Sequence, residues 1–453
     1  MSVEIINPWN GHSEYRYDFM PEARVEALLA ASASGFAQWS QRSLQERAEV
    51  LVRVAAGLRA AREQLAALMG AEMGKLRGEG LAEIEKSAAA CEFYAQRAGD
   101  YLTVQPVATE ARRSYIDYQP IGCVLAIMPW NFPVWQVFRF LAPALMAGNV
   151  ALLKHAITVP RCADAIAQIV HAAGVPVGTF GVLHIDNAAT ARVIADDRIA
   201  AVTLTGSERA GRSVAASAGQ HLKKCVLELG GSDAFVVLDD ADLDAAVTVA
   251  ANSRFGNAGQ TCIAAKRFIV VDAIAEAFTE RLVAAARERL VGDPADPATR
   301  LAPMARADLR DALHRQVSAS VAAGARLLVG GEPQENYSGY PASVLTDVGP
   351  GMPAYREELF GPVASILRVR DDAEAVRVAN DTRFGLGASV WGQDRARAEA
   401  VARQLQAGAV FVNALVRSDV RLPFGGTKQS GFGRELAEHG IREFVNIRTI
   451  WVD

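Results

Sequence analysis

One cysteine stands in a local setting that suits a nucleophile better than a core side chain. Cys262 ends the segment GNAGQTC (residues 256–262), whose glycines and amides make a poor buried strand. A thiol attacks carbonyl carbon near neutral pH because a small fraction is thiolate and the sulfur is intrinsically reactive. A lone cysteine is more often a small buried hydrophobe, but a glycine-rich turn lets a backbone N–H approach whatever the sulfur attacks. Cys262 is therefore the candidate nucleophile.

A carboxylate in a second glycine-rich segment is the candidate base. Glu228 lies in LELGGS (residues 227–232), two residues before the first of two glycines. A carboxylate held on such a turn can accept a proton from an attacking water. The pair of Cys262 and Glu228 predicts attack on a carbonyl followed by hydrolysis of the covalent product.

An asparagine between two prolines is the candidate oxyanion donor. Asn131 lies in MPWNFP (residues 128–133), after an apolar strand and before a helix, which places it at the carboxyl edge of a parallel sheet, where ligands bind. An amide held there can donate to a developing negative oxygen. Taken alone, the hexapeptide fits a rigid turn with a helix-capping asparagine equally well.

Three more segments place polar residues beside apolar strands. TLTGSERAG (residues 203–211) leads from a strand into a helix, whose N-terminus and backbone N–H groups could face phosphate. It lacks a GxGxxG fingerprint, and a plain strand–turn–helix fits the spacing as well. Lys154 ends a strand and EELFGPV (residues 357–363) precedes an apolar stretch; alone, both suit solvated positions. The glycines of residues 423–435 suit a tightly turning backbone.

Together these segments make the chain resemble the NAD(P)-dependent aldehyde dehydrogenase superfamily over nearly its whole length, and within it the bacterial succinate-semialdehyde dehydrogenases. The resemblance implies that Cys262 forms a thiohemiacetal and then a thioester, and that Asn131 and the Cys262 N–H stabilise the oxyanion. It also implies that Glu228 activates the water that hydrolyses the thioester.

The resemblance further implies a dinucleotide cofactor, NAD or NADP. It assigns cofactor contacts to Trp130, Lys154, Thr205, Gly206, Ser207, Glu358 and Phe360. Many NAD-specific relatives carry a glutamate three positions after the lysine, whereas this chain has Ile157. Because no carboxylate repels a 2′-phosphate there, NADP should be tolerated. The preference between the two cofactors stays open.

For the substrate, the resemblance assigns the distal carboxylate to Arg139 on the helix after Asn131 and to Ser418. A guanidinium matches a carboxylate bidentately. A second arginine of some relatives is replaced by Gly256. Either Arg254, Arg417 or Arg421 takes its role, or the selectivity for the carboxylate is looser. The expected reaction is NAD(P)-dependent oxidation of succinate semialdehyde to succinate.

Other functions compete with this one. The chain could oxidise glutarate semialdehyde or an uncharged aliphatic aldehyde, or it could be a non-catalytic structural member of the superfamily. A CoA-acylating enzyme is disfavoured because Glu228 supplies a hydrolytic base. A cofactor-free thiol hydrolase would need a histidine partner, and no histidine lies in a comparable motif.

The elements that must position these residues are those of an α/β protein. Residues 21–98 show apolar positions at helical spacing and predict two or three long helices. Short apolar runs alternate with helical segments from residue 121 and again from residue 234, which predicts two parallel sheets. Polar and apolar residues alternate around Pro106, which predicts a hairpin.

We therefore expect a Rossmann-like cofactor domain (1–100 and 120–230), an α/β catalytic domain (231–418) and a small β oligomerisation arm (101–119 and 436–453). The arm follows from the resemblance, and implies a homodimer or homotetramer. A surface hairpin without a partner is the alternative.

Bulk properties exclude several other classes of protein. The chain has 453 residues and a formal net charge of -4, which suits two or three domains and gives no basic surface for nucleic acid or anionic membranes. Its five cysteines are spread singly, without metal-site or disulfide spacing. Because no export signal or long apolar span is visible, we expect a cytoplasmic enzyme with reduced thiols and no metal.

Overall fold

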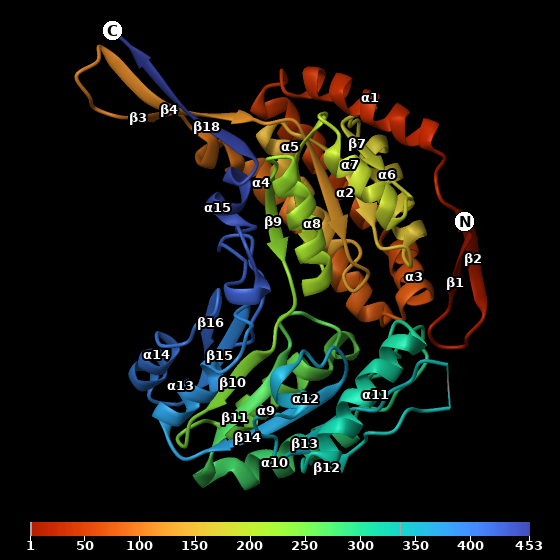
Figure 1. Cartoon of the computed structure of the whole chain (residues 1–453), viewed down its shortest axis with the longest axis vertical. Coiled ribbons are helices and arrows are strands. Elements are labelled where there is room, and N and C mark those ends of the chain that lie inside the picture. Colours follow the sequence, from red (N-terminus) through yellow and green to blue (C-terminus); the bar gives the residue numbers. More distant parts are fainter. Residues whose placement is uncertain (1, 336) are drawn as a thin grey trace.

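The computed structural model describes residues 2–335 and 337–453. Figure 1 shows two α/β blocks, one above the other, and a narrow β arm that leaves the upper block and ends at the C-terminus. None of the helices in the described ranges is long and apolar enough to cross a membrane. The α/β fold class expected from the sequence is confirmed.

The upper block is built on a six-stranded sheet with strand order β17-β9-β8-β5-β6-β7. All its neighbouring strands are parallel except β17, which pairs antiparallel with β9. The strands are β5 (Cys123–Met128), β6 (Val150–His155), β7 (Phe180–Val182), β8 (Ile199–Thr205), β9 (Lys224–Glu228) and β17 (Gly431–Phe432).

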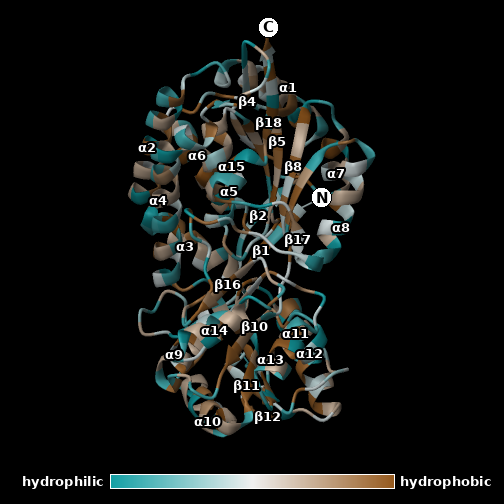
Figure 2. Ribbon diagram, turned by 90° about the vertical axis from the view of Figure 1, so that its left-hand side faces the viewer, coloured by the Kyte–Doolittle hydropathy of each residue, from teal (hydrophilic) through white to brown (hydrophobic). Residues whose placement is uncertain are grey.

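Helices cover both faces of this sheet. Figure 2 shows α2, α4, α5 and α6 on one side of the strands and α7 and α8 on the other, with the apolar strands between them. The helices are α1 (Glu22–Trp39), α2 (Leu44–Ala60), α3 (Arg62–Met73), α4 (Arg77–Leu102), α5 (Trp135–Ala147), α6 (Pro160–Ala172), α7 (Asn187–Ala195) and α8 (Glu208–Gln220).

The first hundred residues form four helices rather than the two or three expected. Ser43 begins α2 with a capping box, in which its hydroxyl accepts from Glu46 N–H and the Glu46 carboxylate accepts from Ser43 N–H. Gly74 ends α3 in a left-handed conformation with φ 76°, which costs glycine little. These local stop signals divide a stretch whose apolar periodicity is nearly continuous.

The lower block is built on a seven-stranded sheet with strand order β12-β13-β14-β11-β10-β15-β16. Its strands are β10 (Asp233–Val237), β11 (Ala265–Val271), β12 (Arg326–Val329), β13 (Ser343–Thr346), β14 (Val363–Val369), β15 (Gly387–Trp391) and β16 (Ala409–Val412). Its helices are α9 (Leu243–Phe255), the 3-10 turn η1 (Gly256–Gly259), α10 (Asp272–Arg287), α11 (Ala307–Ala322), α12 (Pro353–Arg356), α13 (Asp372–Asn380) and α14 (Arg395–Ala402).

Side chains of β10 and β11 alternate between two cores, as a strand buried on both faces requires. Phe235 and Phe268 belong to the core that includes α9 and α10 residues, whereas Val236 and Ile269 belong to the core that includes α11, α13 and α14 residues. The central strands are thus fixed from both sides, and so are the loops at their ends.

The arm is a three-stranded antiparallel sheet of β3 (Gln105–Pro106), β4 (Arg113–Pro120) and β18 (Val445–Val452), with β4 in the middle. The predicted hairpin around Pro106 is present as β3 and β4. The short helix α15 (Ala437–Arg442) packs against α4 and α5 rather than extending into the arm. The domain boundaries given above stay predictions.

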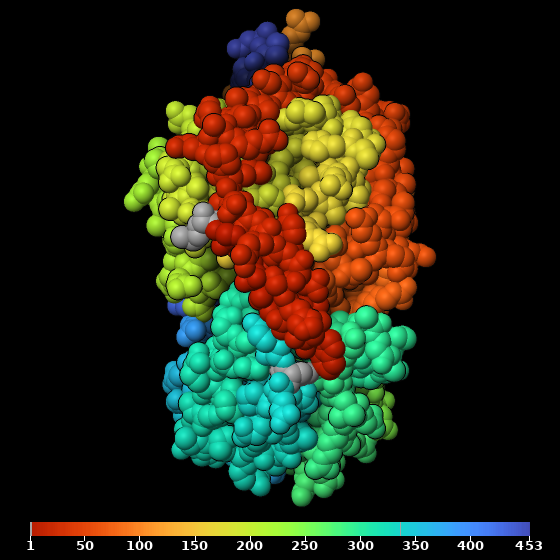
Figure 3. Space-filling view, turned by 90° about the vertical axis from the view of Figure 1, so that its right-hand side faces the viewer, coloured from red at the N-terminus to blue at the C-terminus, as the bar shows by residue number. Residues whose placement is uncertain are grey.

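The N-terminal hairpin of β1 (Ser2–Ile6) and β2 (Ser13–Asp18) spans the two blocks. Figure 3 shows this segment, in red, running down one face from the upper block onto the lower one. After the hairpin's first strand, the carbonyl of Pro8 accepts a hydrogen bond from the Ser338 hydroxyl of the lower block. The hairpin therefore helps to hold the blocks in register.

Candidate active site

The candidate site lies where the chain crosses between the blocks. Residues 229–232 lead from β9 of the upper sheet to β10 of the lower sheet, and Cys262 lies between η1 and β11. The turn before Cys262 is left-handed, with φ 52° at Asn257 and Ala258 and 70° at Gly259. A side chain at Gly259 would lie 2.3 Å from the Gly361 carbonyl oxygen, so only glycine fits there.

Asn131 lies beside this turn with one amide hydrogen free to donate. Its Nδ2 donates to the Gln260 carbonyl at 2.9 Å, and its Oδ1 accepts from Gln136 Nε2 at 3.2 Å. An amide nitrogen carries two hydrogens, so one remains. Within the described ranges, the Cys262 N–H also has no hydrogen-bond acceptor. The structure thus brings together both donors of the predicted oxyanion hole.

The backbone of Asn131 is held from two sides. Its carbonyl accepts from Lys75 Nζ at 2.8 Å and from Asn257 Nδ2 at 2.9 Å. Lys75 is itself fully buried and paired with Glu83. This network fixes the distance between the loop after β5 and the loop that carries the thiol, as a pre-organised donor requires.

A cavity of about 280 Å³ connects Cys262 and Asn131 with most of the predicted cofactor residues. Those that line it are Trp130, Thr205, Gly206, Ser207, Glu358 and Phe360. The rings of Trp130 and Phe360 meet edge to face with centroids 5.9 Å apart. Ser207 caps α8 by accepting from Ala210 N–H at 3.3 Å, and because Gly206 and Ser207 line the cavity, the helix begins at its wall.

These residues fit a dinucleotide. The aromatic pair offers apolar surface to a nicotinamide ring, Glu358 offers acceptors to ribose hydroxyls, and the start of α8 offers N–H donors to phosphate. Lys154 is the second-to-last residue of β6, is 8% exposed and does not line this cavity. Burial lowers its pKa. Ile157 is 41% exposed and places no charge near the end of β6.

Lys266 connects the nucleophile loop with the cofactor cavity, and the sequence motifs did not reveal it. Its Nζ donates to the carbonyls of Thr261 (3.0 Å) and Cys262 (2.7 Å) and lies 3.2 Å from Glu358 Oε1. The same Oε1 accepts from Gly231 N–H at 3.0 Å. A lysine inside an apolar strand, AKRFIVV, was the only sequence signal.

The resting thiol is protonated near neutral pH. Burial raises the pKa of Cys262 to about 11, while the positive charges of Arg139 and Lys266 act in the opposite direction. A buried thiolate lacks hydration, so deprotonation must be coupled to attack or to a nearby base.

Glu228 is buried at the end of β9, which pairs with Thr205 of β8 and Gly431 of β17. Neither carboxyl oxygen has a hydrogen-bond partner among the described residues. Burial, and to a lesser extent the neighbouring Glu435, raise the pKa of Glu228 well above its ordinary value. A side chain at Gly425 would lie 2.8 Å from Glu228 Oε1, so the carboxyl group packs against that glycine.

The structure does not bring Arg139 to a substrate cavity. Its guanidinium is ion-paired with Glu435, donates to Thr205 Oγ1 at 3.0 Å and lies 4.9 Å from the centroid of the Phe424 ring. It is 3% exposed. Because its charge is already neutralised by a buried carboxylate, the predicted contact with a substrate carboxylate finds no support in this geometry.

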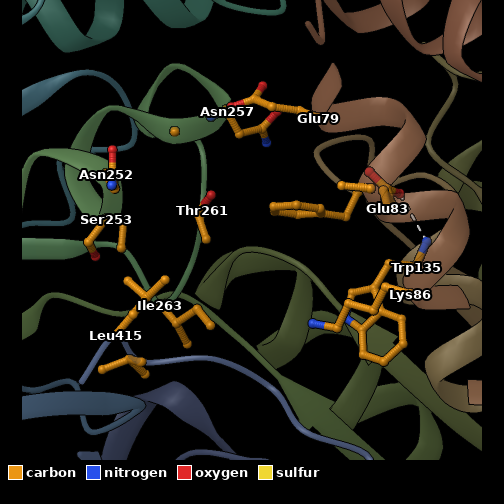
Figure 4. Close-up of a pocket in the computed structure, with 15 residues that line it drawn as sticks. Glu79, Glu83, Lys86, Trp135, Asn252, Ser253, Asn257, Thr261, Ile263 and Leu415 are labelled. Atoms are coloured by element: carbon orange, nitrogen blue, oxygen red, sulfur yellow. Dashed lines mark hydrogen bonds between the residues drawn. The ribbon is translucent and has the colours of Figure 1, made fainter. Parts of the chain in front are cut away.

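A second cavity, of about 320 Å³, lies on the other side of the nucleophile. Thr261 and Ile263, the neighbours of Cys262 in the chain, line it together with Phe132, Trp135 and Leu415. Figure 4 shows Thr261 and Ile263 across the cavity from Trp135. Ser418 does not line the cavity, but it is buried nearby and accepts a hydrogen bond from a cavity-lining lysine, Lys86.

The arginines considered for the missing second carboxylate contact lie elsewhere. Arg254 is fully buried and donates to the carbonyls of Gly259 and Ala265, so it supports the nucleophile turn. Arg421 is exposed and paired with Asp419. Arg417 is exposed and does not line the cavity.

A half-buried thiol between a cavity lined by the predicted cofactor residues and a separate, largely apolar cavity defines a class of enzyme. Such enzymes hold a carbonyl substrate covalently on cysteine beside a redox cofactor. Comparison with known proteins agrees, since the profile of the Aldehyde dehydrogenase family matches residues 1–450. The chain belongs to the aldehyde dehydrogenase family.

Named relatives match along their whole length. The NAD(P)+ succinate semialdehyde dehydrogenase Sad of Escherichia coli (strain K12) is 49% identical, covering 99% of this chain and 97% of that protein. The NADP+ succinate-semialdehyde dehydrogenase 1 of Mycobacterium ulcerans is 45% identical, covering 100% of both. The structure of succinic semialdehyde dehydrogenase from Streptococcus pyogenes with NADP+ superposes with a TM-score of 0.97 at 38% identity, covering 99% of each chain.

Proposed function

We propose that this chain oxidises succinate semialdehyde to succinate with NAD+ or NADP+ as the hydride acceptor. The observation that carries the proposal is the position of Cys262 between two cavities, one lined by the cofactor residues and one by apolar residues with a lysine. The full-length relatives named for this reaction support the substrate.

The first half of the reaction uses Cys262 and Asn131. The Cys262 thiol releases its proton to solvent water, and the thiolate adds to the aldehyde carbon. The new oxyanion accepts from the free Asn131 amide hydrogen and the Cys262 N–H. The thiohemiacetal then loses its hydride, and its carbon becomes a thioester. The cofactor, when bound, accepts that hydride. Trp130, Phe360 and Glu358 orient it in the cavity that Cys262 lines.

The second half of the reaction uses Glu228. Once deprotonated, its carboxylate takes a proton from water, the hydroxide adds to the thioester carbon, and the carbon–sulfur bond breaks to release the acid and the thiolate. In the structure the carboxyl group faces Gly425 rather than the cavity of Cys262. We infer that its side chain turns toward the thioester before it acts.

The residue type at position 157, just after β6, bears on whether NAD+ or NADP+ can bind. We propose that both NAD+ and NADP+ bind, because Ile157 brings no carboxylate to repel a 2′-phosphate. Relatives named for NADP+ or for both cofactors support this.

We also propose that the arm joins copies of the chain. Ile447 and Trp451 of β18 are 59% and 45% exposed, and an edge strand with exposed apolar side chains favours pairing.

The test is a product balance. The purified protein is incubated with succinate semialdehyde and NAD+ or NADP+, and succinate and reduced cofactor are quantified together, with Cys262→Ala as the blank. One succinate per reduced cofactor supports the proposal. Reduced cofactor without succinate, or succinate formed equally by the blank, overturns it.

A further inference from the structure

The helix α4 presents a stripe of charged residues to the second cavity. Glu79, Glu83 and Lys86 all line it, and their spacing of four and three residues places them on one helical face. Figure 4 shows Lys86 beside Trp135, across the cavity from Thr261 and Ile263. A charged group on an otherwise apolar wall requires a partner.

The two carboxyl groups of the stripe are occupied by the protein itself. Glu83 is ion-paired with Lys75 and accepts from the N–H groups of Val134 (2.8 Å) and Trp135 (2.9 Å). Glu79 accepts from Asn257 N–H at 2.7 Å, and burial raises its pKa, which favours the neutral acid. Neither carboxyl group forms an ion pair with Lys86 in the described part of the chain, although Glu83 and the neighbouring Asp419 favour its charge from a greater distance.

Lys86 is held by neutral groups alone. Its Nζ donates to Ser418 Oγ at 2.7 Å and lies 4.1 Å from the centroid of the Trp135 ring. No carboxylate oxygen in the described part of the chain lies within 4.0 Å of this nitrogen. Burial, together with the positive charge of Arg139, lowers the pKa of Lys86 to about 8, and the carboxylates of Glu83 and Asp419 offset this only in part. An ammonium in this position gains most from an anion that enters the cavity.

We infer that Lys86, oriented by Ser418, binds the distal carboxylate of the aldehyde acid substrate. This inference rests on the proposed function, and it assigns specificity to a residue that no sequence motif marked. The aldehyde group faces the wall formed by Thr261 and Ile263, the chain neighbours of Cys262, while Trp135 and Leu415 contact the methylene groups. Arg139 cannot take this role in the observed arrangement because Glu435 already neutralises it.

The arrangement predicts discrimination by charge rather than by size. A substrate carboxylate replaces a neutral environment with an ion pair and a charge-assisted hydrogen bond. A neutral aldehyde of equal length leaves the ammonium unpaired and must still fill the apolar space. Ser418 does not line the cavity, so it acts by accepting from Lys86 Nζ and thereby orienting that nitrogen.

The test compares succinate semialdehyde with butanal in wild type, Lys86→Met and Lys86→Arg. Methionine keeps the length and apolar stem of lysine without the charge. For Lys86→Met, kcat/KM for succinate semialdehyde should fall about 30-fold or more, while kcat/KM for butanal stays level or rises. Lys86→Arg should keep most of the preference. Arg395→Met, which removes an exposed charge on α14 of the lower block, serves as the matched control and should leave both substrates unchanged.

A second readout is inhibition of butanal oxidation by succinate. Wild type should be inhibited competitively with butanal, and Lys86→Met should lose that inhibition while its thermal unfolding midpoint stays at or above that of wild type. Equal loss on both substrates, or unchanged inhibition, overturns the inference.

Failure of the inference differs from failure of the proposed function. A wild-type enzyme that oxidises the two aldehydes alike overturns both the succinate semialdehyde proposal and the subsite. A wild-type preference that survives in Lys86→Met overturns the subsite alone.

Discussion

At the scale of single residues, the two reacting groups are stored in their uncharged forms. The Cys262 thiol is protonated because burial raises its pKa to about 11, and burial likewise favours the neutral Glu228 acid. Each group must lose its proton at a defined step, the thiol before attack and the acid before hydrolysis. Storage in the neutral form protects the thiol from oxidants, since the thiolate is the reactive species.

The raised pKa of Cys262 predicts how its rate of alkylation depends on pH. Because its pKa is raised, the thiolate fraction is small at pH 7 and grows about tenfold per pH unit until the pKa is reached. Alkylation of the cofactor-free enzyme by iodoacetamide, followed on the Cys262 peptide by mass spectrometry, should therefore keep rising through pH 10. Free cysteine is the reference, and a plateau near its own titration range would contradict the burial argument.

If Glu228 is the base for hydrolysis, its substitution should separate acylation from hydrolysis. Glu228→Gln keeps the shape of the side chain but cannot accept a proton, so acylation proceeds and hydrolysis stalls. Stopped-flow mixing should show a burst of reduced cofactor near one equivalent per site, followed by a steady state that is about 100-fold slower or more. Cys262→Ala should show neither phase. A Glu228→Gln steady state as fast as wild type would rule out Glu228 as the base.

At the scale of elements, strand pairing places the base. The two-residue strand β17 brings Gly431 against β9, opposite Glu228. Gly431 has φ 116°, and a side chain there would lie 1.9 Å from the Leu227 carbonyl oxygen. Only glycine allows this close approach. The segment from Pro423 to Glu435, near the C-terminus, therefore sets the position of the Glu228 carboxyl group.

Gly431→Ala should therefore lower both stability and turnover. We expect a loss of a few kcal/mol of unfolding free energy, about 2 or more, because the backbone must shift. Gly99→Ala is the matched control: a side chain at Gly99 of α4 meets nothing within 4 Å, so this helix should be stabilised by about 0.5–1 kcal/mol. Urea unfolding and kcat report the two effects, and a neutral Gly431→Ala would refute the role of β17.

Short sequence motifs predicted the reacting residues better than they predicted the residues that surround them. Cys262, Glu228 and Asn131 each lie in a short motif at the end of a strand, so a parallel sheet alone brings them close. Lys86, Lys266 and Glu435 act on the site from separate elements. The neighbours of Lys86 suit an exposed helix, those of Lys266 an ordinary strand and those of Glu435 a glycine-rich turn.

The orientation of the Arg139 side chain also depends on a distant residue, so the local sequence did not predict it. The helix α5 was predicted correctly, but all its residues are buried, so periodicity did not reveal which face meets the substrate. The buried partner Glu435, nearly at the other end of the chain, decides the direction of the guanidinium.

At the scale of the whole molecule, catalysis depends on the junction between the blocks. The upper block supplies Asn131, Glu228 and the start of α8, and the lower block supplies Cys262, Lys266 and Glu358. Contacts that cross this junction, such as Asn131 to Gln260 and Asn131 to Asn257, therefore align the donor with the thiol.

The arm makes its own prediction at this scale. A double variant, Ile447→Arg with Trp451→Arg, should reduce the mass measured by light scattering, because charge on β18 opposes burial against a second copy. Leu222→Arg, at a 96% exposed position on the upper block, is the control and should leave the mass unchanged. A wild type that runs as a monomer would contradict the proposed assembly.

The central claim is that one thiol serves a carboxylate-bearing aldehyde, and kcat/KM for succinate semialdehyde against butanal tests it most directly. Both aldehydes are measured with NAD+ and with NADP+, and Cys262→Ala is the blank. The account predicts that succinate semialdehyde is preferred by about 100-fold or more, on the order of 2.7 kcal/mol of transition-state binding. Equal values for the two aldehydes would contradict it.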